Sequence, residues 1–174
     1  MIPSLLLVAT FPSFHPPQAT TPALAVAAPA DVDSIDHIVA ALYDVISGPA
    51  GQHRNWDRMR SLFQTGAMMG AVFKTRAGAT REAEFSVERY ITGNDPILMK
   101  EGFFEREVSR KSELYGHIAH VFSTYESRHA PAEKPFERGI NSLQLFNDGN
   151  RWWVRTILWE GESSGEKLPR KYTR

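Results

Sequence analysis

A stretch near the end of the chain matches the nucleophile elbow of serine hydrolases. Gly161-Glu162-Ser163-Ser164-Gly165 fits the motif G-x-S-x-G. In that elbow the serine lies on a turn between a strand and a helix, and a histidine later in the chain activates it. Here the last histidine is His129, and only a polar tail follows the motif. We therefore predict a flexible exit from a final strand, without a serine nucleophile.

Two histidines have a spacing that could suit a metal ion. His117 and His120 lie three positions apart, which would place both rings on one side of a helix. The residues around them predict a strand, however, and positions three apart on a strand point to opposite faces. We find no third ligand for them and expect no metal and no cofactor. His120 alone is either a core histidine bonded to a neighbour or a proton donor or acceptor in a pocket.

Composition limits the remaining possibilities. The chain has 174 residues, of which 42% are apolar, so it can build one packed core. It has 20 basic and 20 acidic residues, and such a balance gives no net field to attract nucleic acid or acidic lipid. Cysteine is absent, which excludes disulfides and thiolate catalysis. We expect no nucleic-acid partner.

The N-terminus resembles a leader. A short apolar run from Leu5 to Phe11 precedes a stretch rich in proline and alanine, and Ala25-Val26-Ala27 offers a signal-peptidase site. No lysine or arginine precedes Arg54, so the positive region of a signal peptide is missing. The run is too short to span a bilayer. Residues 1–30 are therefore either a signal peptide, with a mature chain from about Ala28 in the periplasm or outside the cell, or a disordered leader of a cytoplasmic protein.

The first half of the chain predicts helices. Apolar residues follow helical spacing from Ile35 to Ile46, with Asp33 or Ser34 as the cap and Gly48-Pro49 as the stop. The other elements expected here are a short helix capped by Asn55, a strand over residues 67–74, and a third helical stretch from near Phe85 that Pro96 breaks or restarts.

The second half predicts strands. Aromatic and β-branched residues alternate with polar ones over residues 102–116, 117–130, 135–148 and 151–162. An Asp-Gly pair within Asn147-Asp148-Gly149-Asn150 indicates a hairpin turn. Helices followed by an antiparallel meander indicate an α+β domain with the helices on one face of the sheet. We place that domain at residues 31–162 and a flexible basic tail at residues 163–174.

The chain contains the strings "GFFERE", "AHVFSTYESR", "FERGINSLQL" and "DGNRWWVRTILWE". With the order of the elements, these strings resemble the nuclear transport factor 2-like superfamily in its bacterial SnoaL-like branch. The resemblance covers residues 33–162. It implies a cone in which three N-terminal helices pack on a curled, mainly antiparallel sheet and enclose a pocket. It often implies a dimer through the outer sheet face. It implies no single activity, since the superfamily includes isomerases, dehydratases, epoxide hydrolases and proteins that only bind or scaffold.

The catalytic sets of these relatives do not transfer cleanly. Tyr43 could match the helix tyrosine of the steroid isomerases, but the segment after the second helix, SLFQTGAMMGAVF, has no carboxylate to match their base. The epoxide hydrolases use an Asp-Arg-Asp set, and here Arg138 and Arg155 lie on the late strands without a central aspartate. Glu105, Arg106, Glu107 and Arg110 are expected on a solvated strand face. The missing base favours binding over catalysis.

We therefore predict a binding domain for an apolar small molecule with a polar head, such as a carbonyl or a carboxylate. The alternative is an isomerase-, dehydratase- or hydrolase-like enzyme that uses the same pocket, and a third reading is a dimeric interaction domain. A carboxylate from Asp44, Asp57 or Glu126 in the pocket would favour the enzyme. The expected pocket residues are apolar (Phe63, Tyr90, Phe122, Trp159) and polar (His120, Tyr125, Arg138, Asn141).

Three of the four tryptophans belong to the last predicted strand. Trp152 and Trp153 are adjacent, so one faces the helices and the other the outside of the sheet. We expect a second copy of the chain to cover the outer ring and form a homodimer. A lone exposed ring, or one covered by the C-terminal tail, is the alternative. Alternation also places Arg155 on one face with Trp153 and Trp159.

Overall fold

The computed structural model describes residues 26–173, so the expected leader lies almost wholly outside the described residues. The elements are α1 (Pro29–Val32), α2 (Ile35–Ile46), α3 (Trp56–Leu62), β1 (Phe63–Lys74), β2 (Thr80–Ser86), α4 (Val87–Lys100), β3 (Phe104–Tyr115), β4 (Ile118–Arg128), β5 (Glu137–Asn147), β6 (Trp152–Gly161), η1 (Glu162–Ser164) and η2 (Arg170–Tyr172). No helix among these is long and apolar enough to cross a membrane.

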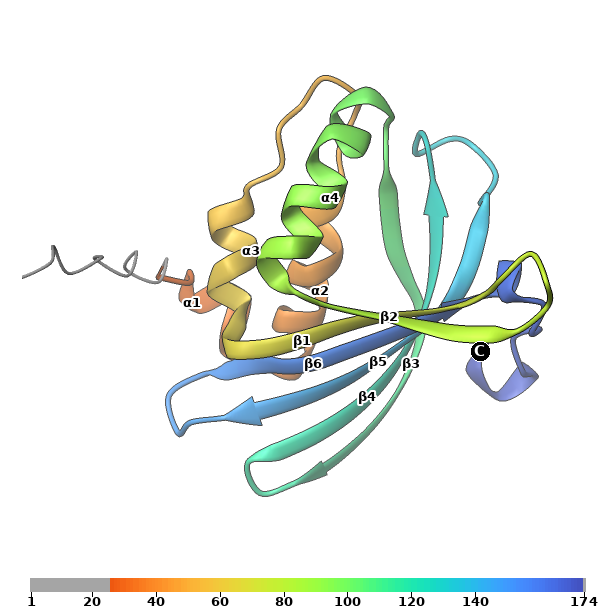
Figure 1. Cartoon of the computed structure of the whole chain (residues 1–174). Helices are drawn as coiled ribbons and strands as arrows, with labels where there is room; N and C mark the ends of the chain where they lie inside the picture. The colour runs from red at the N-terminus through yellow and green to blue at the C-terminus, as the bar shows by residue number, and fades with distance from the viewer. Residues whose placement is uncertain (1–25, 174) are drawn as a thin grey trace, which may run out of the picture.

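The six strands form one curled sheet in the order β2-β1-β6-β5-β4-β3. Neighbouring strands are antiparallel except β1 and β6, which run parallel. Helices α2, α3 and α4 lie together over one face of the sheet, which bends around them (Figure 1). The prediction of an α+β domain with helices on one face of a mainly antiparallel sheet is confirmed.

The predicted helix starts follow from local capping. Ser34 Oγ accepts a hydrogen bond from the backbone N–H of His37 at 3.1 Å, and Asn55 Oδ1 accepts one from the N–H of Arg58 at 2.9 Å. Each side chain satisfies one of the backbone donors that the first turn of a helix leaves without a partner. Helix α2 then buries its apolar face completely at Ile38 and Val39.

The segment around Phe85 differs from the prediction. Residues Thr80–Ser86 form strand β2, and Phe85 pairs with Met69 of β1. Ser86 Oγ accepts from the N–H of Arg89 at 3.2 Å, so α4 begins only after this cap. Helix α4 also continues through Pro96, which was expected to break or restart it. The predicted helix is therefore present after Ser86, whereas Phe85 itself lies on a strand.

The two adjacent tryptophans face opposite ways, as predicted. Trp152 is buried in the core, whereas Trp153 is on the outer face and half-buried. The guanidinium of Arg151 lies 3.6 Å from the Trp153 ring centroid, and Trp153 Nε1 donates to Asp148 at 2.8 Å. Arg151 thus covers part of this ring. A homodimer through the outer face stays a prediction.

The end of the chain packs on the outer face of the sheet. Thr124 Oγ1 donates to the carbonyl oxygen of Tyr172 at 2.6 Å, and the Tyr172 and Phe122 ring centroids are 5.4 Å apart. Lys74 Nζ is 3.8 Å from a carboxyl oxygen of Glu166. These contacts place the C-terminal segment against β4 and near the end of β1.

Arg54 ties together the loop between α2 and α3. Its side chain is 6% exposed and donates to the carbonyl oxygens of Ile46 at 2.9 Å, Gly48 at 2.7 Å and Gln52 at 2.6 Å. No carboxylate accepts from it, so the backbone carbonyls alone satisfy the guanidinium. Burial accordingly lowers the pKa of Arg54 from its ordinary value.

We expect the substitution Arg54→Met to lower the free energy of unfolding by about 2–4 kcal/mol, because it leaves several carbonyl oxygens without their donor. Urea unfolding followed by circular dichroism measures this change. Arg76→Met is the matched control, since Arg76 is exposed in the β1–β2 turn. It should shift the free energy by less than about 0.5 kcal/mol. Equal effects of the two substitutions would show that the Arg54 bonds contribute nothing.

Candidate functional site

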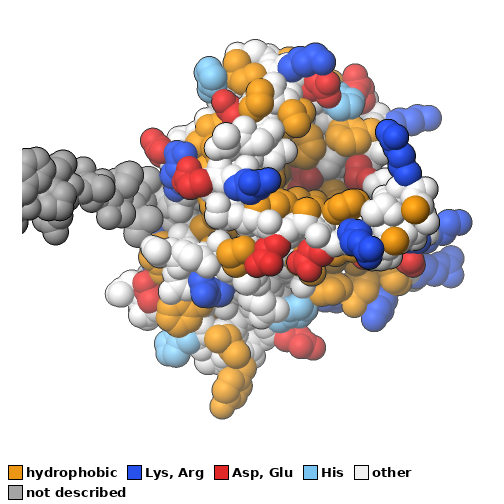
Figure 2. Space-filling view, in the orientation of Figure 1, with side chains coloured by type: hydrophobic (Ala, Val, Ile, Leu, Met, Phe, Trp, Pro, Cys, Tyr) orange, Lys and Arg blue, Asp and Glu red, His pale blue; other side chains and the backbone are white. Residues whose placement is uncertain are grey.

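A cavity of about 390 Å³ lies between the helices and the concave face of the sheet. Its walls come from α2, α3, α4 and five of the six strands, and most of the side chains on them are apolar or aromatic. Phe73 and Phe136 line it and are 43% and 51% exposed. We infer that they mark the opening. Figure 2 shows a hollow between the helices and the β1–β2 arm, with hydrophobic and acidic side chains visible in it. A space of this size suits one small molecule.

Several side chains expected in a pocket line this cavity. They are Phe63, Tyr90, Tyr125, Asn141 and Trp159. The rings of Tyr90 and Trp159 meet edge to face with centroids 6.2 Å apart, which fixes one wall. Their binding of a ligand stays a prediction.

Three expected pocket residues do not line the cavity, and those predictions are corrected. His120 Nδ1 is 2.5 Å from the Nε2 atom of Gln144, Phe122 packs on Tyr172, and Arg138 lies 3.9 Å from Glu162. All three occupy even-numbered positions of β4 and β5, which face outward. Alternation alone gave the two faces of these strands but not which one is concave.

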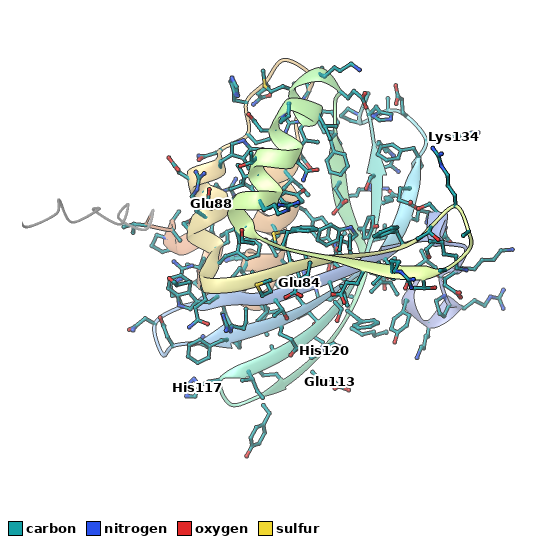
Figure 3. The ribbon with its side chains drawn as sticks, viewed as in Figure 1. Glu84, Glu88, Glu113, His117, His120 and Lys134 are labelled. Atoms are coloured by element: carbon teal, nitrogen blue, oxygen red, sulfur yellow. The ribbon has the colours of Figure 1, made fainter. Side chains whose placement is uncertain are left out.

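The two histidines of the sequence motif lie at the hairpin between β3 and β4. His117 is in the turn, and His120 is on β4 (Figure 3). Both lie far from Lys134, which is in the loop between β4 and β5 at the other end of these strands. Within residues 26–173 there is no group of three or more potential metal ligands.

Two carboxylates that the sequence reading overlooked line the cavity: Glu105 of β3 and Glu137 of β5. Glu105 pairs across the sheet with Ser127, and Ser127 pairs with Glu137, so the three form one row on the concave face. The prediction that Glu105 faces solvent on the strand surface is wrong. The prediction rested on charge alone, because charged residues close together on a strand ordinarily face water.

The carboxylates considered from the sequence are engaged elsewhere. Asp44 pairs with Arg58, and Asp57 lies 2.8 Å from Arg60. Glu126 faces outward, where Arg106 and Arg128 both donate to it. None of these three carboxylates lines the cavity.

Glu105 has the electrostatics of a proton-transfer group. Burial raises the pKa of its carboxyl group from 4.5 to about 7, because the cavity wall offers little water to stabilise the charge. Hydrogen bonds from Ser127, at 2.8 Å, and from Asn141 oppose this rise. The carboxyl group is therefore partly protonated near neutral pH, which suits both donating and accepting a proton.

Three tyrosines near Glu105 keep their protons. Burial raises the pKa of Tyr43, Tyr90 and Tyr125 above the ordinary tyrosine value, and the negative charge of Glu105 raises each further. Glu137 adds to the rise at Tyr125. These hydroxyl groups can therefore donate hydrogen bonds but do not titrate with Glu105.

A pair of glycines makes room for two polar groups of the site. Gly139 of β5 and Gly161 of β6 lie opposite each other. A Cβ atom on Gly139 would lie 2.6 Å from the hydroxyl of Tyr125, and one on Gly161 would lie 2.7 Å from the carboxyl group of Glu137. Any larger residue at these positions would displace the two polar groups.

Two solved structures support the fold. The structure matches a protein of unknown function with a cystatin-like fold from Nostoc punctiforme at a TM-score of 0.54 and 11% identity, covering 75% of this chain and 90% of that one. It matches the Kfla4162 protein from Kribbella flavida at 0.54 and 8%, covering 74% and 88%. An NTF2-like protein of unknown function from Methylobacillus flagellatus gives 0.45 and 11%, covering 74% and 94%. No family model and no curated protein matches the sequence.

The protein has a nuclear transport factor 2-like, cystatin-like fold. The fold inferred from the sequence is thus confirmed. At 8–11% identity, the matches with Nostoc punctiforme and Kribbella flavida carry the fold and no activity. The SnoaL-like branch stays a prediction. What the nuclear transport factor 2-like cone does in this chain depends on the residues inside it.

The high pKa of Glu105 predicts how stability depends on pH. The folded protein holds this proton more tightly than the unfolded chain, so stability is greatest below about pH 4.5 for this group and is lost as pH rises through about 7. The loss is at most roughly 3–4 kcal/mol, because the pKa rises by about 2.5 units and each unit corresponds to about 1.4 kcal/mol. We expect Glu105→Gln to remove this loss.

Urea unfolding at pH 5 and pH 8 measures the difference. The matched control is Glu113→Gln, because Glu113 is on the same strand and exposed. This control should keep the pH dependence of the wild type. If Glu105→Gln and wild type lose the same stability between the two pH values, the raised pKa is wrong.

Proposed function

We propose that the protein is an acid–base enzyme in which the cavity binds one small apolar molecule and Glu105 moves a proton on it. The observation that carries this proposal is a carboxyl group with a pKa of about 7 on the wall of a largely apolar cavity. A carboxylate base was the element that the sequence lacked. Its presence on β3 moves the preference from binding alone to catalysis.

The charge of the cavity wall narrows the kind of ligand. Glu105 and Glu137 line the cavity, whereas no lysine, arginine or histidine of the described residues does. An anionic head would meet two acidic groups without a cation to offset them, which is unfavourable in a site with little water. The carboxylate head considered from the sequence is therefore disfavoured. An uncharged carbonyl on an apolar body fits the wall better.

The geometry supports a proton transfer next to a carbonyl group. Glu105 and Tyr125 are diagonal neighbours on β3 and β4, since Tyr125 pairs with Glu107. The Tyr125 hydroxyl, which stays protonated, donates a hydrogen bond to the carbonyl oxygen. The carbon–hydrogen bond next to the carbonyl breaks, its proton goes to Glu105, and its electron pair forms the enol or enolate. Glu105 then returns the proton to another carbon, so the reaction is an isomerisation without net oxidation.

A domain that only binds or scaffolds gains nothing from this arrangement. A buried carboxyl group costs folding free energy whenever it ionises, and a glutamine of the same shape would avoid that cost. The groups that hydrogen-bond the Glu105 carboxyl group among the described residues, Ser127 and Asn141, are both uncharged. A strained titratable group in a cavity is typical of a catalytic site.

Exchange of the hydrogens next to a carbonyl in D₂O tests the proposal. We expect the wild-type protein to accelerate this exchange in a panel of apolar cyclic ketones, followed by NMR. Glu105→Gln should lower kcat by about 100-fold or more, because a positioned general base contributes that much. The rate should rise as pH passes through about 7, where Glu105 loses its proton.

Two controls separate catalysis from binding. Glu113→Gln, on the exposed side of the same strand, should exchange at the wild-type rate. Thermal shift with the same ketones should show that Glu105→Gln still binds them. An unchanged exchange rate in Glu105→Gln would contradict the proposed role. Binding of ketones by the wild type without any exchange would leave a binding protein.

A further inference from the structure

A hydrogen-bond chain crosses the interior from the outside of the cone to the cavity. At its outer end, Arg110 Nε and Nη2 donate to the two carboxyl oxygens of Glu107 at 2.8 and 2.6 Å. Ser123 Oγ donates to Glu107, and the Tyr43 hydroxyl oxygen lies 2.6 Å from Ser123 Oγ. Asn141 Nδ2 donates to the Tyr43 hydroxyl at 3.1 Å. The chain therefore joins an ion pair near the surface to the cavity wall.

The donors in this chain can point in only one direction. Both oxygens of Glu107 accept from Arg110, so this carboxylate is an acceptor for Ser123. The single hydroxyl hydrogen of Ser123 is then used, and Ser123 must accept from Tyr43. The hydroxyl hydrogen of Tyr43 is used in turn, so Tyr43 must accept from an N–H group. This fixes the NH₂ end of the Asn141 amide toward Tyr43.

The same NH₂ end serves the proton-transfer group. Asn141 and Glu105 both line the cavity, and hydrogen bonding from the Asn141 side chain lowers the pKa of the Glu105 carboxyl group and so favours its ionised form. An amide turned the other way would present its oxygen to Glu105 and repel the carboxylate. The end of the Asn141 amide that faces the cavity therefore affects the pKa of Glu105. The orientation of the amide is set through the hydrogen bonds that join Asn141 to Glu107 by way of Tyr43 and Ser123.

We propose that Glu107, held by Arg110, is a positioning residue that orients the Asn141 amide through Ser123 and Tyr43 and so keeps a hydrogen-bond donor on Glu105. The inference rests on the proposed role of Glu105 in proton transfer. Neither Glu107 nor Ser123 lines the cavity, so both act through the other members of the chain. Arg110 also contacts Asp36 of α2, which ties the outer end of the chain to the helices.

Three other titratable groups that line the cavity are not members of this chain. They are Tyr90 on α4, Tyr125 on β4 and Glu137 on β5: the charge of Glu105 raises the pKa of both tyrosines, and Glu137 adds to the rise at Tyr125. Arg54 lowers the pKa of Tyr90 but is bonded to backbone carbonyls. A change in the titration of Glu105 after substitution of Glu107 or Ser123 therefore reports on the amide.

The titration of Glu105, followed through its side-chain ¹³C carboxyl signal, tests the inference. In Glu107→Gln the new amide can donate to Ser123, which allows the whole chain and the Asn141 amide to reverse. In Ser123→Ala the chain is cut. We expect the pKa of Glu105 to rise by about one unit in both variants, because one hydrogen bond to a charged group is lost. Ser123→Thr, which keeps the hydroxyl, should restore the wild-type value.

Two further measurements separate this role from a structural one. Glu113→Gln should leave the titration of Glu105 unchanged, and the pH dependence of the exchange rate should move with the pKa in the two altered variants. Variants that lose stability while Glu105 titrates as in the wild type would overturn the inference. If Glu107→Gln does not fold, the Ser123→Ala and Ser123→Thr pair decides. A shifted titration with no ketone exchange in the wild type would contradict the enzyme and leave the chain standing.

Discussion

The burial of one carboxyl group is the constraint that organises the interior of this protein. Glu105 lies on the wall of the cavity, and among residues 26–173 only a hydroxyl and an amide group, and no arginine or lysine, hydrogen-bond its carboxyl group. A cation at this place would lower its pKa and fix it as a carboxylate. Uncharged donors instead leave the proton close to balance at neutral pH. The surrounding polar side chains therefore have to be held in one orientation, because each of them shifts that balance.

The strands meet this requirement through two departures from regular pairing. The register of β3 and β4 shifts between Glu107 and Ser109, which turns Arg110 to the same face as Glu107. Without that bulge, Arg110 would point outward and the outer end of the hydrogen-bond chain would lack its cation. On β6 a second shift, opposite Gln144 and Leu145, leaves Arg155 between the paired residues. Trp153 and Trp159 consequently face opposite sides, contrary to the single face expected from simple alternation.

Much of the fold could be predicted from the sequence, and the site only in part. Helical spacing and caps gave α2 and α3, and alternation gave the last four strands, because both signals are local. The side of the sheet that is concave is not a local property, so His120 and Arg138 were placed in the wrong face. Glu105 was missed for a different reason: an acidic residue on a strand ordinarily faces water. Residues that break the pattern of the core are typical of functional sites.

The polar network around Glu105 is complete, which distinguishes it from an accidental burial. No buried polar side-chain atom of residues 26–173 lacks a hydrogen-bond partner. A fully satisfied network holds its members rigidly, whereas a partly satisfied one would relax or admit water. The three tyrosines on which the charge of Glu105 acts have pKa values raised well above neutrality, so their protonation does not change when Glu105 titrates. The cavity wall thus combines one carboxyl group with a pKa near neutral and tyrosines that keep their protons, and this asymmetry is the reason for proposing Glu105 as the acid–base group and Tyr125 as the fixed donor.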